Sequence, residues 1–169
     1  MNFNFTDEQK MLRGLAKEFV DGEVRPVAQK IDEEEEIPND LIKKIGEIGF
    51  LGLSFPEEYG GGGFGEFGYC IMQEEMTRAC NSTATFIGAH QSIGTNAIYL
   101  GGSEEIKRKY LPPLCSGEKI AAFTLTEPGA GSDTFNLSTK AELVGDKWIL
   151  NGNKVWITNA GIANVFSVF

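Results

Sequence analysis

The stretch between Arg78 and Glu104 contains no Asp, Glu, Lys or Arg. We expect a helix over about residues 83–100, and a helix that is apolar on most of its sides is usually central in a core. Polar residues within it, such as His90 and Gln91, make it too polar for a helix that spans a bilayer. The stretch therefore predicts the central helix of a folded core.

Small residues recur along this helix, namely Gly88, Ala89, Gly94 and Ala97. They leave room for something to lie against the helix backbone. Two interpretations stay open, either close packing of a neighbouring element or the wall of a ligand pocket. His90 is the only histidine of the chain, and we interpret it as an interior group with satisfied hydrogen bonds and not as a base.

Four further helices are expected around the central one. Residues 6–9 form a capping box that opens the first helix. Residues 38–40 cap the second helix, and the third spans residues 67–80. The last helix opens at Ser103, and the proline pair at residues 112–113 is expected to end it.

The helix of residues 67–80 carries two kinds of side chain. Its inward stripe is expected to be Tyr69, Met72, Met76 and Ala79, and its outward side chains are Glu74, Glu75 and Arg78. Neighbouring carboxylates on a helix point in different directions. We therefore interpret the two glutamates as solvated charge and not as acid–base machinery.

Residues 63–68 match the pattern GxGxxG, which is the fingerprint of a dinucleotide-binding turn. Here no strand runs into the pattern, and no βαβ unit surrounds it. Glu57, Glu58 and Glu66 would also repel a pyrophosphate. The pattern is therefore predicted to be a flexible loop between helices.

From Ile120 onward the pattern changes from helices to strands. Strands are expected to begin at Ile120 and to cover residues 139–143, 148–150, 155–158 and 164–169. The predicted fold class is α+β, with an all-helical domain over residues 1–118 and the beginning of a β-barrel-like domain over residues 119–169. An apolar strand at a terminus would expose an unpaired edge, so we expect this chain to be part of a longer protein.

The composition excludes several kinds of partner. The net charge is −9 at pH 7 and no basic patch is present, which argues against nucleic acid. Cys70, Cys80 and Cys115 are odd in number and lack a CxxC spacing, which disfavours a zinc site or a disulfide framework and fits the cytoplasm. The acidic run at residues 32–36 is interpreted as a solvated face, although it could also bind a basic partner or a cation. Residues 1–5 contain no signal region, and nothing in the sequence requires a membrane span.

Residues 122–133 form an apolar strand end that runs into a tight loop containing Gly129 and Gly131. The glycines let a partner approach the backbone, and Thr126 and Ser132 offer hydroxyls. Such a loop suits an anionic group or the edge of a flat heteroaromatic ring. The spacing alone leaves an ordinary hairpin turn open as the alternative.

The string at residues 125–133, LTEPGAGSD, resembles the first signature of the acyl-CoA dehydrogenase family. Residues 156–159, WITN, resemble that family's second flavin-contacting segment. The likeness covers essentially the whole chain, which would be less than half of a family member. Residues 88–94 are most similar to the very-long-chain branch, which implies a deep pocket for a medium-to-long acyl chain.

The resemblance implies FAD as the cofactor. The residues it implies for binding FAD are Phe123, Leu125, Thr126, Gly131, Ser132, Trp156, Ile157 and Thr158. Trp156 would form a wall for the flavin ring, the other interpretation being a core residue of a sheet. Thr126 and Thr158 would donate to the ring edge, and Ser132 would also lie near the acyl-CoA substrate. We expect Glu127 and Asp133 to fix the loop through hydrogen bonds.

The reaction implied is FAD-dependent α,β-dehydrogenation of acyl-CoA thioesters, of the fatty-acid β-oxidation type. The family's catalytic glutamate would come from a C-terminal domain beyond Phe169, so no catalytic residue and no metal ligand is assigned here. The implied partners are the acyl-CoA substrate, an electron-transfer flavoprotein and further copies of the protein, joined through that C-terminal domain. The alternatives are an acyl-CoA oxidase, a flavin monooxygenase of the same architecture, and a non-catalytic binding or assembly module.

Overall fold

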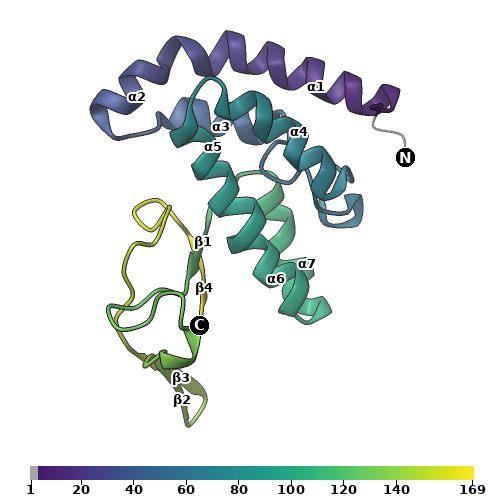
Figure 1. Ribbon diagram of the computed structural model, residues 1–169. Coiled ribbons are helices and arrows are strands. Elements are labelled where there is room, and N and C mark those ends of the chain that lie inside the picture. Colours follow the sequence, from purple (N-terminus) through teal and green to yellow (C-terminus); the bar gives the residue numbers. More distant parts are fainter. Residues whose placement is uncertain (1–3) are drawn as a thin grey trace.

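The computed structural model describes residues 4–169, and Figure 1 shows a helical region followed by a small β region. This arrangement confirms the predicted α+β class with the helices first. The α-helices are α1 (Asp7–Phe19), α2 (Ala28–Glu34), α3 (Asn39–Glu47), α4 (Gly65–Thr77), α5 (Asn81–Gly88), α6 (Asn96–Gly101) and α7 (Glu104–Cys115). The π- and 3₁₀-helical segments are η1 (Val20–Val24), η2 (Arg25–Val27), η3 (Glu57–Tyr59), η4 (Ala89–Thr95) and η5 (Thr134–Asn136). The expectation about a signal region falls partly on residues 1–3, which lie outside the described residues.

A long helical run joins α1 to α2 along one side of the helical region (Figure 1). It begins at the predicted capping box, where the Thr6 hydroxyl accepts from the Gln9 N–H and the Gln9 side chain accepts from the Thr6 N–H. At Gly22 and Pro26 the run changes to η1 and then η2. Pro26 has no N–H, so a regular α-helical ladder cannot pass through it. The run is thus interrupted by a change of helix type, after which α2 continues.

Helix α4 begins at Gly65, two residues earlier than predicted, and packs against α1. Gly65 and Gly68, from the GxGxxG pattern, therefore lie inside a helix, and the prediction of a loop was wrong for this half of the pattern. Gly68 is buried at this contact, where a Cβ atom would lie 3.3 Å from the Cδ2 of Leu12 on α1. The pattern thus serves helix packing.

The predicted inward stripe of α4 is confirmed at Met72 and Met76, which are fully buried. The prediction that Glu75 points into solvent was wrong, because this residue is only 4% exposed. Its carboxylate accepts from the Arg13 Nε at 2.8 Å, and Arg78 lies 3.4 Å from its other oxygen. The arginine on α1 lets the glutamate be buried, since a buried charge is tolerated when it is paired.

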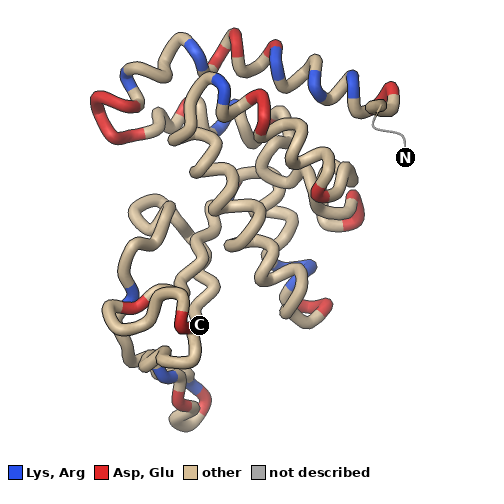
Figure 2. Tube along the Cα trace, viewed as in Figure 1, with Lys and Arg blue, Asp and Glu red and all other residues tan. Residues whose placement is uncertain are grey.

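The uncharged stretch forms one continuous helix made of α5, η4 and α6, and its first two segments are largely buried. His90, Gln91 and Thr95 have no exposed surface. Figure 2 shows this helix free of charged residues and the acidic residues 32–36 gathered at the turn after α2. The prediction of a central helix is confirmed, and its middle is wound as a π-helix, a form that often occurs at functional sites.

Helix α7 runs to Cys115, so the prediction that Pro112 and Pro113 end it was wrong. Two prolines inside a helix remove two N–H donors. The segment nevertheless stays helical because Leu111, Leu114 and Cys115 are buried in the core. Tertiary packing outweighs the local preference here.

The β region contains two pairs of strands, β1 (Ala121–Thr124) with β4 (Val165–Val168), and β2 (Lys140–Val144) with β3 (Lys147–Asn151). The first pair is parallel, and the second is the predicted antiparallel hairpin. The strand predicted at residues 155–158 is absent, because Trp156 has a φ of +60°, outside the extended region. The β1–β4 pair lies beside the central helix, where the two regions of the chain meet (Figure 1).

Candidate functional site

The loop after β1 is fixed by Glu127, which is buried. Its carboxylate accepts from the Lys154 ammonium at 2.8 Å, from the Thr139 N–H at 2.9 Å, and from both the N–H and the hydroxyl of Ser138. Lys154 also donates to the Leu125 carbonyl. These donors, with Lys154 the most important, hold the pKa of Glu127 well below its usual range.

Glu127 is therefore a permanently ionised anchor, which confirms the prediction that it fixes the loop. Asp133 acts in the same way further along, because its carboxylate accepts from the Phe135 N–H and from the Asn136 amide. Both carboxylates are engaged by hydrogen-bond donors of the chain, which leaves neither suited to remove a proton from a substrate.

Trp156 lies on the segment that faces this loop, and its indole is 90% exposed. Within the described residues, Trp156 is therefore not a core residue of a sheet. Its φ of +60° is unusual for a bulky side chain and costs free energy. Neither burial nor a favourable backbone conformation explains a tryptophan at this position.

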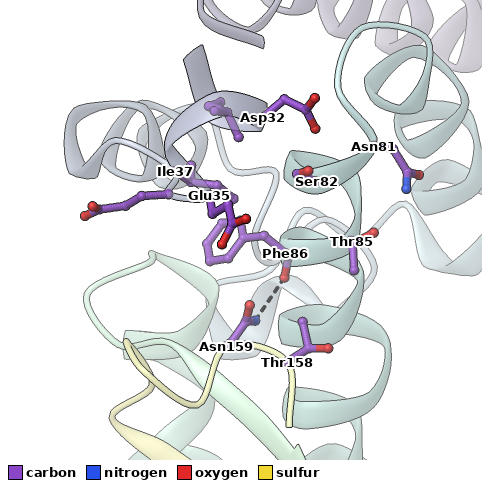
Figure 3. A pocket seen from close by; sticks show the side chains of 11 residues that line it. Asp32, Glu35, Ile37, Asn81, Ser82, Thr85, Phe86, Thr158 and Asn159 are labelled. Carbon is purple, nitrogen blue, oxygen red and sulfur yellow. Dashed lines mark hydrogen bonds between the residues drawn. The ribbon is translucent and has the colours of Figure 1, made fainter. Parts of the chain in front are cut away.

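The backbone on both sides of Trp156 is held in place. The Val155 N–H donates to the Thr126 carbonyl at 3.0 Å, which joins the two predicted flavin motifs directly. Asn159, also at positive φ, donates from its side-chain amide to the Phe86 carbonyl at 3.1 Å and to the Ala121 carbonyl at 3.4 Å. Figure 3 shows the first of these two bonds, between the segment and the central helix. The indole is thus presented to solvent by a fixed backbone.

The other predicted site residues lie around the same surface. Phe123 is half-buried on β1, with its ring centroid 4.7 Å from that of Phe169. Leu125, Thr126 and Ile157 are half-buried, whereas Gly131, Ser132 and Thr158 are exposed. The structure brings residues 123–126 close to 156–158 through the bond between Val155 and Thr126, and it leaves Gly131 and Ser132 further along the exposed loop.

Two grooves of about 420 Å³ each run beside the central helix and share Ser92 and Ile93. One lies against α4 and is lined by Tyr69, Gln73 and Thr158 in addition to residues of the central helix. The other lies toward the β region and reaches Phe123 and Phe169. A third pocket, of about 390 Å³ (Figure 3), is rimmed by Asp32, Glu35 and Glu36 and does not suit an anion.

The room left by the small residues of the central helix is largely filled by the protein. A Cβ atom at Gly94 would lie 2.9 Å from the Cβ of Ala121 on β1, and one at Gly88 would lie 3.2 Å from the Tyr69 hydroxyl. Close packing therefore explains why position 94 has a glycine, and it explains in part why position 88 has one. Ala89, together with Gly88, still lines the groove against α4, so both interpretations of the small residues apply, at different positions.

His90 is an interior group, as predicted. Its Nδ1 accepts from the Ala121 N–H at 2.9 Å, which leaves Nε2 as the donor to the Leu114 carbonyl at 3.0 Å. Burial lowers the pKa of His90 to about 4. The neutral ring is thus used to join the central helix to β1 and α7, and it is not available as a base.

Sequence reasoning placed Asn159 in the second motif without assigning it a role, and it missed Tyr69 and Gln73 as residues of this region. Asn159 had a usable signal, because asparagine tolerates positive φ and caps turns. Tyr69 was assigned to the core stripe, and nothing local distinguishes a tyrosine that packs in the core from one that reaches a groove. Within residues 4–169 no cluster of three metal-ligating side chains occurs, and none of the described helices has the length and hydrophobicity to span a bilayer.

Comparison with known proteins gives consistent matches over the whole chain. The family model for the acyl-CoA dehydrogenase N-terminal domain matches residues 6–118, and the model for the middle domain matches residues 122–169. The chain is 44% identical to the short-chain-specific acyl-CoA dehydrogenase of Clostridium acetobutylicum, over all of this chain and 45% of that protein. It is 41% identical to the mitochondrial isovaleryl-CoA dehydrogenase of Bos taurus, over 96% of this chain and 39% of that one.

Among solved structures, the acyl-CoA dehydrogenase of Bacillus anthracis complexed with FAD superimposes with a TM-score of 0.89 at 42% identity, covering 98% of this chain and 29% of that one. The chain thus spans less than half the length of these proteins. The names of the Clostridium acetobutylicum and Bos taurus relatives state short-chain and isovaleryl substrates. These names correct the expected similarity to the very-long-chain branch, which rested on seven residues of one helix.

Proposed function

The chain belongs to the acyl-CoA dehydrogenase family, and we propose that the protein uses FAD to oxidise the α,β bond of a short or branched acyl-CoA thioester. The observation that carries this proposal is Trp156, which is exposed on a fixed backbone at positive φ. A fold accepts such a cost where the side chain acts on something outside the chain. A planar ring system stacked on the indole satisfies that requirement.

The residues around Trp156 fit a flavin. Thr126 and Thr158 carry hydroxyls on the two segments that the Val155–Thr126 bond joins, where they would donate to the ring edge. The exposed Gly131 and Ser132 would approach the phosphates or the substrate. FAD, when bound, supplies the acceptor for the hydride that leaves the β-carbon of the substrate.

The described residues position and shield the reactants. Trp156 covers one face of the ring site, and the groove that contains Thr158 receives the acyl group. Glu127 takes no proton from the substrate, because four hydrogen bonds from Lys154, Ser138 and Thr139 already hold it as an anion. We place the catalytic glutamate outside residues 1–169, in a C-terminal domain that would also join the copies of a homo-oligomer.

The substrate preference is drawn from two observations. The Tyr69 hydroxyl occupies the space beside Gly88, which removes the deep extension expected for a long acyl chain. The names of the relatives point the same way, toward short and branched acyl groups. For the electron acceptor we propose an electron-transfer flavoprotein, and for the compartment the cytoplasm, where three free thiols stay reduced.

The test uses the protein expressed from the complete coding frame that contains this chain. We expect it to purify with FAD and to lose its visible flavin absorbance when butyryl-CoA is added without oxygen. Rapid reoxidation by oxygen would favour an oxidase. Absence of FAD, with a stable folded protein, would favour a binding or assembly module and contradict the proposal.

Trp156→Ala tests the observation that carries the proposal. Loss of an aromatic stacking partner is expected to raise the dissociation constant for FAD by about tenfold. The matched control is Trp148→Ala, which removes the other tryptophan, 65% exposed on β3. Equal FAD affinity in the two variants would contradict the role assigned to Trp156.

A further inference from the structure

One wall of the groove against α4 is formed by a pair of polar side chains. Tyr69 and Gln73 lie on α4, and across from them lie Gly88 and Ser92 on the central helix. Thr158 lines the same groove, so the groove connects with the segment that carries Trp156. An acyl group whose reacting carbons lie at that segment would extend along the central helix toward this pair of side chains.

The head of Tyr69 fills the space that a glycine leaves open. A Cβ atom at Gly88 would lie 3.2 Å from the Tyr69 hydroxyl and 3.4 Å from the Gln73 amide nitrogen. Both distances are at or below ordinary van der Waals contact, so the two polar heads occupy the space that a side chain at Gly88 would need. The absence of a side chain at Gly88 therefore gives no extra depth to the groove.

Hydrogen bonds hold the pair in this position. The Gln73 amide donates to the Tyr69 hydroxyl at 2.9 Å and to the Ala84 carbonyl at 3.0 Å. The second bond fixes which end of the amide is the nitrogen, and it leaves the Gln73 Oε1 buried without a partner. An orphaned buried oxygen is unfavourable, which is consistent with a pair retained for a purpose other than stability.

We propose that Tyr69 and Gln73 form a bar across the groove that limits the length of the acyl group, a role that rests on the proposed function. A saturated short or branched chain ends before the bar. A longer chain meets a hydrogen-bonded polar pair, and its terminal methylene groups would have to displace the Tyr69 hydroxyl from its glutamine partner. The bar thus disfavours long acyl chains, and it does not recognise a polar group on the substrate.

The test compares butyryl-, hexanoyl- and octanoyl-CoA on the protein from its complete coding frame. In Tyr69→Ala, kcat/KM for octanoyl-CoA relative to butyryl-CoA is expected to rise by about tenfold, the effect of opening an apolar pocket by a few carbon atoms. Tyr69→Phe keeps the ring and removes only the hydroxyl, so a smaller rise is expected. Tyr110→Ala is the matched control, since Tyr110 lies on α7 and does not line the groove.

Calorimetry with non-reacting S-alkyl-CoA thioethers gives a second readout that does not depend on turnover. The same shift toward longer alkyl groups is expected in the two Tyr69 variants. Unchanged chain-length profiles in Tyr69→Phe, with butyryl-CoA still reducing the flavin, would overturn the bar and leave the proposed function standing. Failure of every acyl-CoA to reduce the wild-type flavin would overturn the proposed function and this inference with it.

Discussion

At the scale of single residues, the residues of the site perform two distinct tasks. His90 and Glu127 are fully engaged by hydrogen bonds and join elements far apart in the sequence. Trp156 and Tyr69, by contrast, reach a surface that could contact a ligand. The first group explains why the site has its shape, and the second explains what the site could bind.

His90 makes the stability of the fold depend on pH. Its pKa is about 4 when folded and near 6.5 when unfolded, so the unfolded chain binds the proton more readily. The stability this residue provides is complete above about pH 6.5 and falls as the pH drops toward 4, by about 3 kcal/mol in total. Urea unfolding at several pH values measures this loss.

His90→Gln is the comparison for that measurement. A glutamine can still accept from Ala121 and donate to Leu114, but it does not titrate. We expect the variant to be less stable at neutral pH and to lose less stability between pH 6.5 and 4. If the free energy of unfolding falls equally with pH in the two proteins, the pKa of His90 does not differ between the folded and unfolded states.

At the scale of elements, the central helix depends on its close approach to β1. A side chain at Gly94 would meet Ala121 at 2.9 Å and the Ala89 carbonyl at 3.0 Å. Gly94→Val is therefore expected to destabilise the protein by about 1–3 kcal/mol, through overpacking. Gly101→Ala is the matched control, because nothing lies within 4 Å of its added carbon, and it should be neutral or slightly stabilising. Thermal unfolding of both variants tests this expectation. Equal unfolding midpoints of the two variants would contradict the close packing at Gly94.

Sequence patterns predicted the elements where local chemistry decides them. The capping box at Thr6 and the neighbouring strands predicted at residues 139–143 and 148–150 are examples, since each requires only neighbours in the chain. The predictions failed at Pro112, Glu75 and Trp156 because distant partners decide these positions. Buried leucines keep α7 helical, Arg13 allows Glu75 to be buried, and contacts around residues 126 and 159 hold Trp156 away from a strand. The site motifs were visible in the sequence, but the filling of the groove by Tyr69 was not.

At the scale of the whole molecule, the helical region is well packed and the β2–β3 hairpin is not. Every residue of β2 and β3 is exposed, including Leu143, Trp148 and Leu150, each more than half exposed. Apolar side chains on both faces of a hairpin form a surface that binds other apolar surfaces.

This exposure predicts that residues 1–169, produced alone, self-associate. Light scattering should show aggregation that grows with protein concentration, and Trp148→Lys together with Leu150→Lys should reduce it. Met11→Lys is the control, because it adds a charge at an exposed apolar residue of α1, far from the hairpin in sequence. An equal effect of the control, or a monomeric wild type, would contradict the role of the hairpin.

The parallel pairing of β1 with β4 also has a consequence for the order of events during synthesis. The central helix leaves the ribosome long before Ala121, which supplies the N–H for His90, and before Ser167, whose hydroxyl donates to the Gly94 carbonyl. Until those residues have been synthesised, the His90 imidazole lacks its hydrogen-bond donor. The face of the central helix at Gly94 likewise lacks the strand that packs against it. The helices can form early, but their final docking against the β1–β4 pair has to wait until β4 has been translated.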